Sequence, residues 1–202
     1  MPEILFATHN IWKARLFSPA FQAYGFTMKT LQDIAPDHEP LTEAGKTAVE
    51  NALTKARYYH SESHPWVFAD DAGLEIDALN GEPGLQTRRW NGIFPDNVDD
   101  QTWLNYLLER MKDIPAEKRT AAFVSGWALI IPNGSECVHE VRSPFQIATQ
   151  PIRALSKGSP ISAVRIGPED DLKSRQAHIL EEWKRWGILE KIGAISTVSI
   201  QP

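Results

Sequence analysis

The chain has 202 residues, of which 42% are hydrophobic and 23% are charged, and its formal net charge is −5. This length and composition predict one compact domain, or one domain of two lobes, that buries about 70% of its unfolded surface. The negative charge argues against nonspecific nucleic-acid binding, which depends on cationic surface, but it still allows a small polyanion to bind a local basic cluster. No apolar run approaches the roughly 20 residues of a membrane span.

The N-terminal residues MPEILFATHN carry no basic leader and only a short apolar run, so we expect no secretory signal. Cys137 is the single cysteine and therefore cannot form an internal disulfide. Together these features lead us to expect a cytoplasmic protein.

The first predicted elements alternate between strands and helices. Residues 3–8 (EILFAT) are typical of a buried strand, a helix is predicted over 11–24, and a second strand over 26–31. Pro19 should kink or divide that helix, because proline has no N–H for the helical hydrogen bond. Residues 47–60 predict another helix, since their apolar side chains recur at helical spacing.

The next apolar run, residues 66–70 (WVFAD), predicts a strand, and residues 74–79 (LEIDAL) alternate with period two before the turn signal Asn80-Gly81. Residues 99–114 predict an amphipathic helix. Residues 120–132 and 136–149 predict two long strands that flank a Pro-Asn-Gly turn. Residues 168–186 predict a final helix. Because helices and strands interleave around a hairpin, we predict an α/β fold with a mixed sheet.

Polar residues follow the first predicted strand. Thr8, Asn10 and the free N–H groups of the next helix could hold phosphate oxygens, with Lys13 supplying positive charge. The alternative is ordinary helix capping by Asn10 beside a solvated lysine. Taken alone, this segment favours the alternative.

A second polar cluster comprises Glu43, Glu50, Asn51 and Lys55. Lys55 follows Asn51 by four residues, so their side chains share one face of the predicted helix. Taken alone, the cluster is better explained as a solvated helix flank.

Asp70 and Asp71 come directly after the apolar run WVFA and before Ala72-Gly73, which would let the chain turn tightly. Adjacent carboxylates repel each other, and a buried pair is costly unless positive charge lies between them. A hard ion such as Mg²⁺ prefers carboxylate oxygens and bridges to phosphates, and one carboxylate could also orient or deprotonate a water. The alternative is a turn in which one aspartate caps neighbouring amides, but the position after a buried strand favours function.

Two arginines, Arg88 and Arg89, follow the loop GEPG. Either could neutralise a phosphate, and either could be a surface residue whose aliphatic stem packs on the protein. The sequence holds no Walker A loop, no zinc-ligand spacing and no nucleophile elbow.

Taken in order, these motifs make the sequence similar to the inosine triphosphate pyrophosphatase family. The matching segments are ATHNIWK (7–13), TEAGKTAVENALTKAR (42–57), FADDAGLEIDALNGEPGLQTRRW (68–90) and, more weakly, RTAAFVSGWALIIPNG (119–134). They fall within about the first two-thirds of the chain. The combined order is specific, although no single motif is.

The resemblance implies one domain over residues 1–202, with an elongated mixed α/β fold of two lobes, a central cleft and a homodimeric assembly. It implies an enzyme that uses Mg²⁺ to hydrolyse a nucleoside triphosphate, by the family default an abnormal purine nucleotide, to the monophosphate and pyrophosphate. The partners that it implies are the nucleotide and a second copy of the chain, with no nucleic acid and no membrane.

The resemblance also assigns roles to residues. It implies that Asp71, with Asp70 close by, is the base that prepares water for attack at the α-phosphorus, and that Glu43 and Asp71 hold the metal. The residues that it implies for substrate binding are Thr8, Asn10, Lys13, Lys55, Arg89, Lys173 and Arg175. A metal–triphosphate complex would then supply the positive charge that the paired carboxylates need.

The C-terminal third departs from the family pattern. The family's GFGYDP segment, which helps to shape the base pocket, is replaced by residues 158–169 (GSPISAVRIGPE), and its Ser-His-Arg signature is replaced by Lys-Ser-Arg at 173–175. Ala72 stands where the family commonly has serine, and Trp12 is large for the loop around the triphosphate. The triphosphate half of the expected site is therefore kept, whereas the base half is rebuilt.

Three interpretations stay open. The leading one is a Mg²⁺-dependent pyrophosphatase for abnormal purine nucleotides. A second keeps the chemistry but changes the base, for example to a modified pyrimidine. The third is a non-catalytic nucleotide-binding or interaction protein, in which Trp183 and Trp186 on one helical face contact a partner, although core packing or a dimer interface explains those tryptophans more simply.

Overall fold

The computed structural model describes residues 1–34, 41, 44–167 and 172–188. The chain forms two compact units. Unit 1 comprises Met1–Asp71, Gly126–His139 and Asp171–Pro202, and unit 2 comprises Ala72–Ser125 and Glu140–Asp170. The expectation of a single domain over residues 1–202 stays a prediction.

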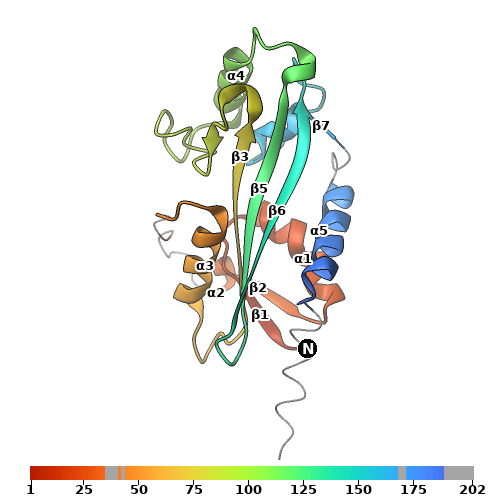
Figure 1. Cartoon of the computed structure of the whole chain (residues 1–202). Coiled ribbons are helices and arrows are strands. Elements are labelled where there is room, and N and C mark those ends of the chain that lie inside the picture. The colour runs from red at the N-terminus through yellow and green to blue at the C-terminus, as the bar shows by residue number, and fades with distance from the viewer. Residues whose placement is uncertain (35–40, 42–43, 168–171, 189–202) are drawn as a thin grey trace, which may run out of the picture. The chain divides into compact units, whose positions relative to one another are not determined.

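Unit 1 is built on a mixed sheet in the order β2-β1-β3-β5-β6. Its strands are β1 (Glu3–Phe6), β2 (Thr27–Thr30) and the unit-1 parts of β3 (Val67–Ile76), β5 (Thr120–Ile130) and β6 (Glu136–Ile147). Its helices are α1 (Ile11–Ala23), α2 (Leu31–Ile34), α3 (Ala48–Tyr59) and α5 (Leu172–Trp186) (Figure 1). β1 pairs in parallel with β2 and with β3, and α1 makes the crossover that a parallel pair requires, so the predicted α/β class is confirmed.

The two faces of this sheet carry different cores. On one face, strand rings pack against rings from α1 and α5; these six are Phe6, Phe17, Phe21, Phe68, Trp127 and Trp183. On the other face, small and aliphatic strand residues, among them Val67 and Ala69, pack against Ala52 of α3. Because successive side chains of a strand point to opposite faces, Asp70 follows Phe68 to the α1 face and Asp71 follows Ala69 to the α3 face.

Helix α1 runs from Ile11 to Ala23 with Pro19 inside it, so Pro19 does not divide the helix, while the alternative of a kink stays a prediction. Pro19 has no N–H to donate to the carbonyl oxygen of Arg15, four residues earlier. Gln176 on α5 donates its side-chain amide to that oxygen at 3.0 Å. The neighbouring helix thus satisfies the acceptor that proline leaves unpaired.

Strand β3 runs continuously from Val67 to Ile76, so the tight turn predicted at Ala72-Gly73 was wrong. Gly73 is needed for a close approach instead, since a Cβ at this position would lie 2.9 Å from the carbonyl carbon of Gly84. The chain turns later, at Asn80-Gly81, where the φ angles are +53° and +85°, and this confirms the turn predicted there.

Unit 2 contains the remaining parts of β3, β5 and β6. Its other elements are β4 (Pro83–Gly84), α4 (Asp100–Arg110), β7 (Arg165–Ile166) and three 3-10 turns, at Asp77–Leu79, Ala116–Lys118 and Pro160–Ala163. β4 pairs antiparallel with β3, and β7 pairs antiparallel with β6. α4 buries Trp103 and Leu107 in the core of this unit, and the segment that departs from the family pattern contributes Ile161 and Val164 to the same core.

Helix α5 ends at Trp186, before Gly187 with φ +69°, as predicted, whereas its expected start at residue 168 lies outside the described residues. Trp183 and Trp186 are 1% and 7% exposed within unit 1. The interpretation of both tryptophans as core residues is confirmed, and their interpretation as anchors for a partner was wrong. Among the residues that the structure describes, no helix is both long enough and apolar enough to cross a lipid bilayer.

Candidate active site

Six of the side chains expected in the site line one pocket of unit 1, with a volume of about 240 Å³. Its lining residues are Ala7, Thr8, His9, Asn10, Lys13, Leu31, Leu41, Lys55, Tyr59, Asp70 and Asp71. The polar ones come from the segment after β1, the first turn of α1, the middle of α3 and β3. The pocket lies beyond the carboxyl end of β1, where open α/β sheets commonly bind ligands.

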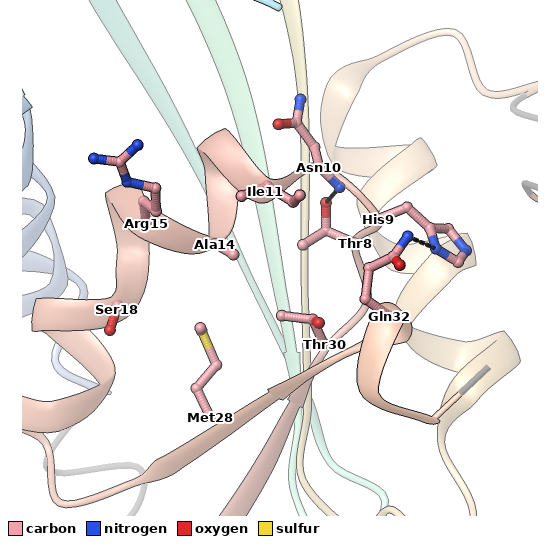
Figure 2. A pocket seen from close by; sticks show the side chains of 10 residues that line it. All are labelled: Thr8, His9, Asn10, Ile11, Ala14, Arg15, Ser18, Met28, Thr30 and Gln32. Carbon is pink, nitrogen blue, oxygen red and sulfur yellow. Dashed lines mark hydrogen bonds between the residues drawn. The ribbon is translucent and has the colours of Figure 1, made fainter. Parts of the chain in front are cut away.

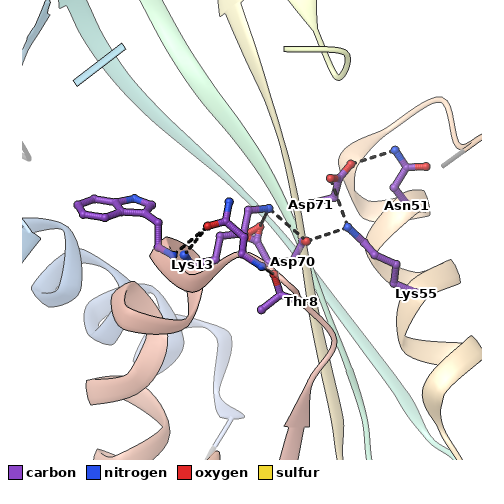
Figure 3. A network of polar contacts seen from close by, with 8 residues as sticks. Thr8, Lys13, Asn51, Lys55, Asp70 and Asp71 are labelled. Carbon is purple, nitrogen blue, oxygen red and sulfur yellow. Dashed lines mark hydrogen bonds and ion pairs between the residues drawn. The ribbon is translucent and has the colours of Figure 1, made fainter. Parts of the chain in front are cut away.

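The two adjacent aspartates are both buried, at 5% exposure for Asp70 and 6% for Asp71, and each meets a lysine on its own face of β3. On the α1 side, the Nζ of Lys13 lies 3.2 Å from Asp70 Oδ2. On the α3 side, the Nζ of Lys55 lies 3.4 Å from Asp71 Oδ1 (Figure 3). The carboxylates therefore point apart, and each has its own ammonium group, which explains how a buried strand accommodates the pair.

The same two lysines converge on one backbone oxygen. The carbonyl of Asp70 accepts from Lys55 at 3.0 Å and from Lys13 at 3.4 Å. Two ammonium groups within reach of a single oxygen concentrate positive charge in a small volume, although the chain as a whole is acidic. Such a cluster suits a polyanion with several oxygens, such as a polyphosphate.

The loop between β1 and α1 is held by its own polar side chains. Asn10 is the N-cap of α1, and its Oδ1 accepts from the N–H groups of Trp12 at 2.9 Å and Lys13 at 3.3 Å. Thr8 Oγ1 accepts from the N–H of Asn10 at 3.1 Å. The capping role of Asn10 is thus confirmed, and the N–H groups of Trp12 and Lys13 are not free for a phosphate. The Thr8 hydroxyl and the Asn10 amide group still carry donors that a ligand could accept.

Asn51 belongs to the second polar cluster, but we did not expect it in the site. Its side chain is 4% exposed. Nδ2 donates to Asp71 Oδ2 at 2.9 Å, and Oδ1 accepts from the N–H of Gly45 at 2.8 Å. Asn51 and Lys55 both face Asp71, so the solvated helix flank expected here was wrong for these two residues. Their spacing of four residues was the signal that could have placed them together.

Tyr59 lies one turn beyond Lys55 on α3 and also lines the pocket. Burial raises the pKa of its hydroxyl, and the charge of Lys55 opposes that rise more weakly. The phenol therefore stays neutral at physiological pH and forms part of the pocket wall.

A second pocket of about 350 Å³ adjoins the first and shares Thr8, His9 and Asn10 with it. Figure 2 shows that its other walls come from α1, β2 and α2. Met28 is part of its lining, and the Nδ1 atom of His9 lies 3.3 Å from the amide nitrogen of Gln32. We assign no chemistry to this pocket.

The other residues expected in the site lie elsewhere. Arg89 belongs to unit 2, where it forms an ion pair with Asp96 at 3.4 Å. Lys173 and Arg175 lie on α5 in unit 1, Lys173 exposed and Arg175 buried with its guanidinium 6.0 Å from the ring of Trp12. These three are not among the described residues that line the 240 Å³ pocket. Glu43, the expected metal ligand, lies outside the described residues.

The donor atoms of the pocket are compatible with magnesium. Within residues 1–34, 41, 44–167 and 172–188, no three or more His, Cys, Asp or Glu side chains are arranged to hold a metal ion. The pocket does offer two buried carboxylates and the Asp70 carbonyl, which are oxygen donors. Mg²⁺ is commonly bound through one or two carboxylates, with substrate phosphates and waters completing its shell. The residues thus fit a magnesium ion that arrives with a polyphosphate.

Comparison with known proteins places the chain in a family. The model of the Ham1 family matches residues 4–156. The chain belongs to the Ham1 family. The resemblance found in the motifs is therefore confirmed. The Ham1 match ends just before residue 158, where the sequence begins to depart from the expected pattern.

Individual relatives agree with this assignment. A dITP/XTP pyrophosphatase from Bacillus cereus is 36% identical over 136 residues, which are 67% of this chain and 64% of the relative. The matched part thus spans slightly less than two thirds of that protein. The crystal structure of a nucleoside-triphosphatase / dITP/XTP pyrophosphatase from Mycobacterium abscessus is 35% identical, with a TM-score of 0.60 over 81% of this chain and 82% of that one.

The structure of a HAM1 protein from Coxiella burnetii has a TM-score of 0.72 and covers 95% of this chain and all, 100%, of that one. Its sequence is 24% identical, so this likeness supports the fold alone.

Proposed function

We propose that this Ham1-family chain hydrolyses a nucleoside triphosphate to the nucleoside monophosphate and pyrophosphate. The observation that carries the proposal is the unit-1 pocket, in which buried Asp70 and Asp71 each contact one lysine and both lysines donate to one carbonyl oxygen. The names of the relatives, dITP/XTP pyrophosphatases, support both the reaction and a substrate with an abnormal purine base.

In the proposed complex, the lysines are the main phosphate ligands. Lys13 and Lys55 exchange their carboxylate partners for oxygens of the triphosphate, and Thr8 and Asn10 donate to the same chain of phosphates. These donors stabilise the charge that builds on the departing pyrophosphate, and this stabilisation contributes to catalysis because it is strongest in the transition state.

Asp71 is the proposed general base. Its Oδ1 takes a proton from a water that attacks the α-phosphorus, and the bond between the α-phosphorus and the bridging oxygen to the β-phosphate breaks. Asp71 and, by its position in the family motif, Glu43 would hold Mg²⁺, with Asp70 close by. The ion, when bound, supplies Lewis-acid polarisation of phosphate oxygens. The carboxylate of Asp71 is suited to the role of general base because Asn51 and Lys55 fix it in a buried position.

The remaining expectations are part of the same proposal. By their positions in the family motifs, Arg89, Lys173 and Arg175 would contact the nucleotide. The family resemblance favours a homodimer, and the single cysteine favours a cytoplasmic location. Light scattering coupled to size-exclusion chromatography tests the dimer, which predicts twice the chain mass of 22.7 kDa.

The decisive assay is pyrophosphate release over a panel of purine, deaminated purine and pyrimidine nucleoside triphosphates, with Mg²⁺ and with a chelator. We expect release from dITP or XTP that stops when the metal is chelated. Release from a pyrimidine substrate alone would favour the altered-base interpretation. Thermal stabilisation by nucleotides without turnover of any substrate would contradict the proposal and favour the non-catalytic alternative.

A further inference from the structure

We propose that Asn51 is a positioning residue that fixes the orientation of the Asp71 carboxylate. The inference rests on the proposed function for its kinetic consequences, while its structural part can be tested without turnover.

The first argument is that both ends of the Asn51 amide are bonded. Its NH₂ group donates to Asp71 Oδ2 at 2.9 Å, and its oxygen accepts from the N–H of Gly45 at 2.8 Å. Rotating the amide by half a turn would place an oxygen against a carboxylate oxygen and an NH₂ group against an N–H. Both contacts would repel, so the surroundings determine a single orientation of the amide.

The second argument concerns the two oxygens of Asp71. Oδ2 is held by Asn51, while Oδ1 lies 3.4 Å from the Nζ of Lys55. With the Asp71 side chain 9% exposed, the carboxylate has little water around it that could compete for Oδ2. Asn51 therefore leaves Oδ1 as the oxygen available to a ligand or a water, which is the oxygen that the proposed chemistry uses (Figure 3).

The third argument is that the backbone of Asn51 is itself fixed. It lies in the first turn of α3, where Thr47 Oγ1 accepts from the N–H of Glu50 at 3.1 Å. This turn also rests on β5, since a Cβ at Gly126 would lie only 2.1 Å from the nitrogen of Val49. A residue that fixes the orientation of a catalytic carboxylate has to lie on a rigid element, and Asn51 lies on one.

A purely structural role is the competing explanation, because Asn51 also secures the loop at Gly45. Glu50 offers a matched control. Its carboxylate accepts from the N–H of Lys46 at 2.6 Å, so it secures the same loop from the same helical turn without being bonded to Asp71. If loop anchoring were the only role of Asn51, Glu50→Ala would give the same kinetic effect as Asn51→Ala.

The kinetic experiment compares four variants. Asn51→Ala removes both bonds, and Asn51→Asp keeps an acceptor for Gly45 but cannot donate to Asp71. Should the added charge of Asn51→Asp prevent folding, Asn51→Leu removes the donor at similar side-chain size without adding charge. We expect each folded Asn51 variant to lose about 100-fold in kcat, with KM changed less than about threefold, because misplacing a reacting group by about 1 Å costs that much.

Glu50→Ala should keep kcat within about threefold of wild type. Equal losses for Asn51→Ala and Glu50→Ala, or an unchanged kcat in Asn51→Ala, would overturn the inference.

A second readout needs no activity. In metal-free wild-type protein, the side-chain NH₂ signals of Asn51 in an NMR spectrum should exchange slowly with water, and Asp71→Ala should make that exchange faster. Rapid exchange in the wild type would overturn the inference even for an active enzyme. Absence of pyrophosphate release with slow exchange would instead contradict the proposed function and leave the bond between Asn51 and Asp71 standing.

Discussion

Gly126 supports the part of the site that α3 contributes, and its replacement by alanine should be severe. A Cβ at this position would lie 2.1 Å from the nitrogen and 2.5 Å from the Cα of Val49, and 2.2 Å from the carbonyl carbon of Ala48. These are backbone atoms, so no side-chain rotation can relieve the overlap. The start of α3 would have to move by about 1.3 Å, which is the difference between 2.1 Å and an ordinary contact of 3.4 Å.

We expect Gly126→Ala to lower the free energy of unfolding by about 1–3 kcal/mol or more, as overpacking typically does. We also expect kcat for pyrophosphate release to fall about 100-fold, because Asn51 and Lys55 would move with the helix. Gly134 is the control: it lies in the turn after β5 with φ +81° and open space around it, so Gly134→Asn should be tolerated. Urea unfolding and steady-state kinetics measure both effects. A Gly126→Ala variant with wild-type stability and kcat would refute the packing of α3 on β5.

Three further changes have separate expected outcomes. Lys55→Met should raise KM for the nucleotide at least about tenfold, because a charged hydrogen bond to phosphate contributes about 1.5–3 kcal/mol; an unchanged KM would remove Lys55 from substrate binding. Gln176→Leu removes the side-chain donor to the exposed carbonyl of Arg15 and should lower the free energy of unfolding by about 0.5–1.5 kcal/mol in urea titrations, with KM unaffected. Hydrogen bonds from Thr102 lower the pKa of Asp99, the N-cap of α4, below 3.8. The ionised Asp99 carboxylate therefore stabilises the folded state at pH values above its pKa in the unfolded chain, and this stabilisation is lost as pH falls through its pKa in the folded state. The difference in free energy of unfolding between wild type and Asp99→Ala should thus be larger at roughly pH 6 than at roughly pH 2.

Local sequence patterns were sufficient for most elements of the fold. A short apolar run identifies β1, helical spacing identifies α3 and α4, and Asn80-Gly81 marks a turn because both residues adopt positive φ. The errors arose where the local conformation depends on a segment that is far away in the sequence. Pro19 does not end α1 because Gln176, far along the chain, supplies the missing donor. Gly73 was interpreted as a turn residue because nothing nearby shows that β4 pairs with β3 at that point.

The site was predictable in its residue types and less so in its geometry. Thr8, Lys13 and Lys55 were selected by the family resemblance, since each of their segments taken alone favoured a capping or surface role, whereas the position of the aspartates after a buried strand itself favoured function. The opposite orientation of Asp70 and Asp71 requires β3 to continue past them, and the predicted turn concealed this. The role of Asn51 depends on a bond to a strand in a different part of the sequence, which helical spacing alone does not show.

The most direct test is the kcat of Asp71→Asn for pyrophosphate release from dITP or XTP with Mg²⁺, measured beside wild type. The substitution keeps the size of the side chain and removes its ability to accept the water proton. We expect kcat to fall about 10²–10⁴-fold, the usual contribution of a general base, while the variant stays folded by circular dichroism. A folded Asp71→Asn variant that releases pyrophosphate at the wild-type rate would contradict the proposed role of this pocket.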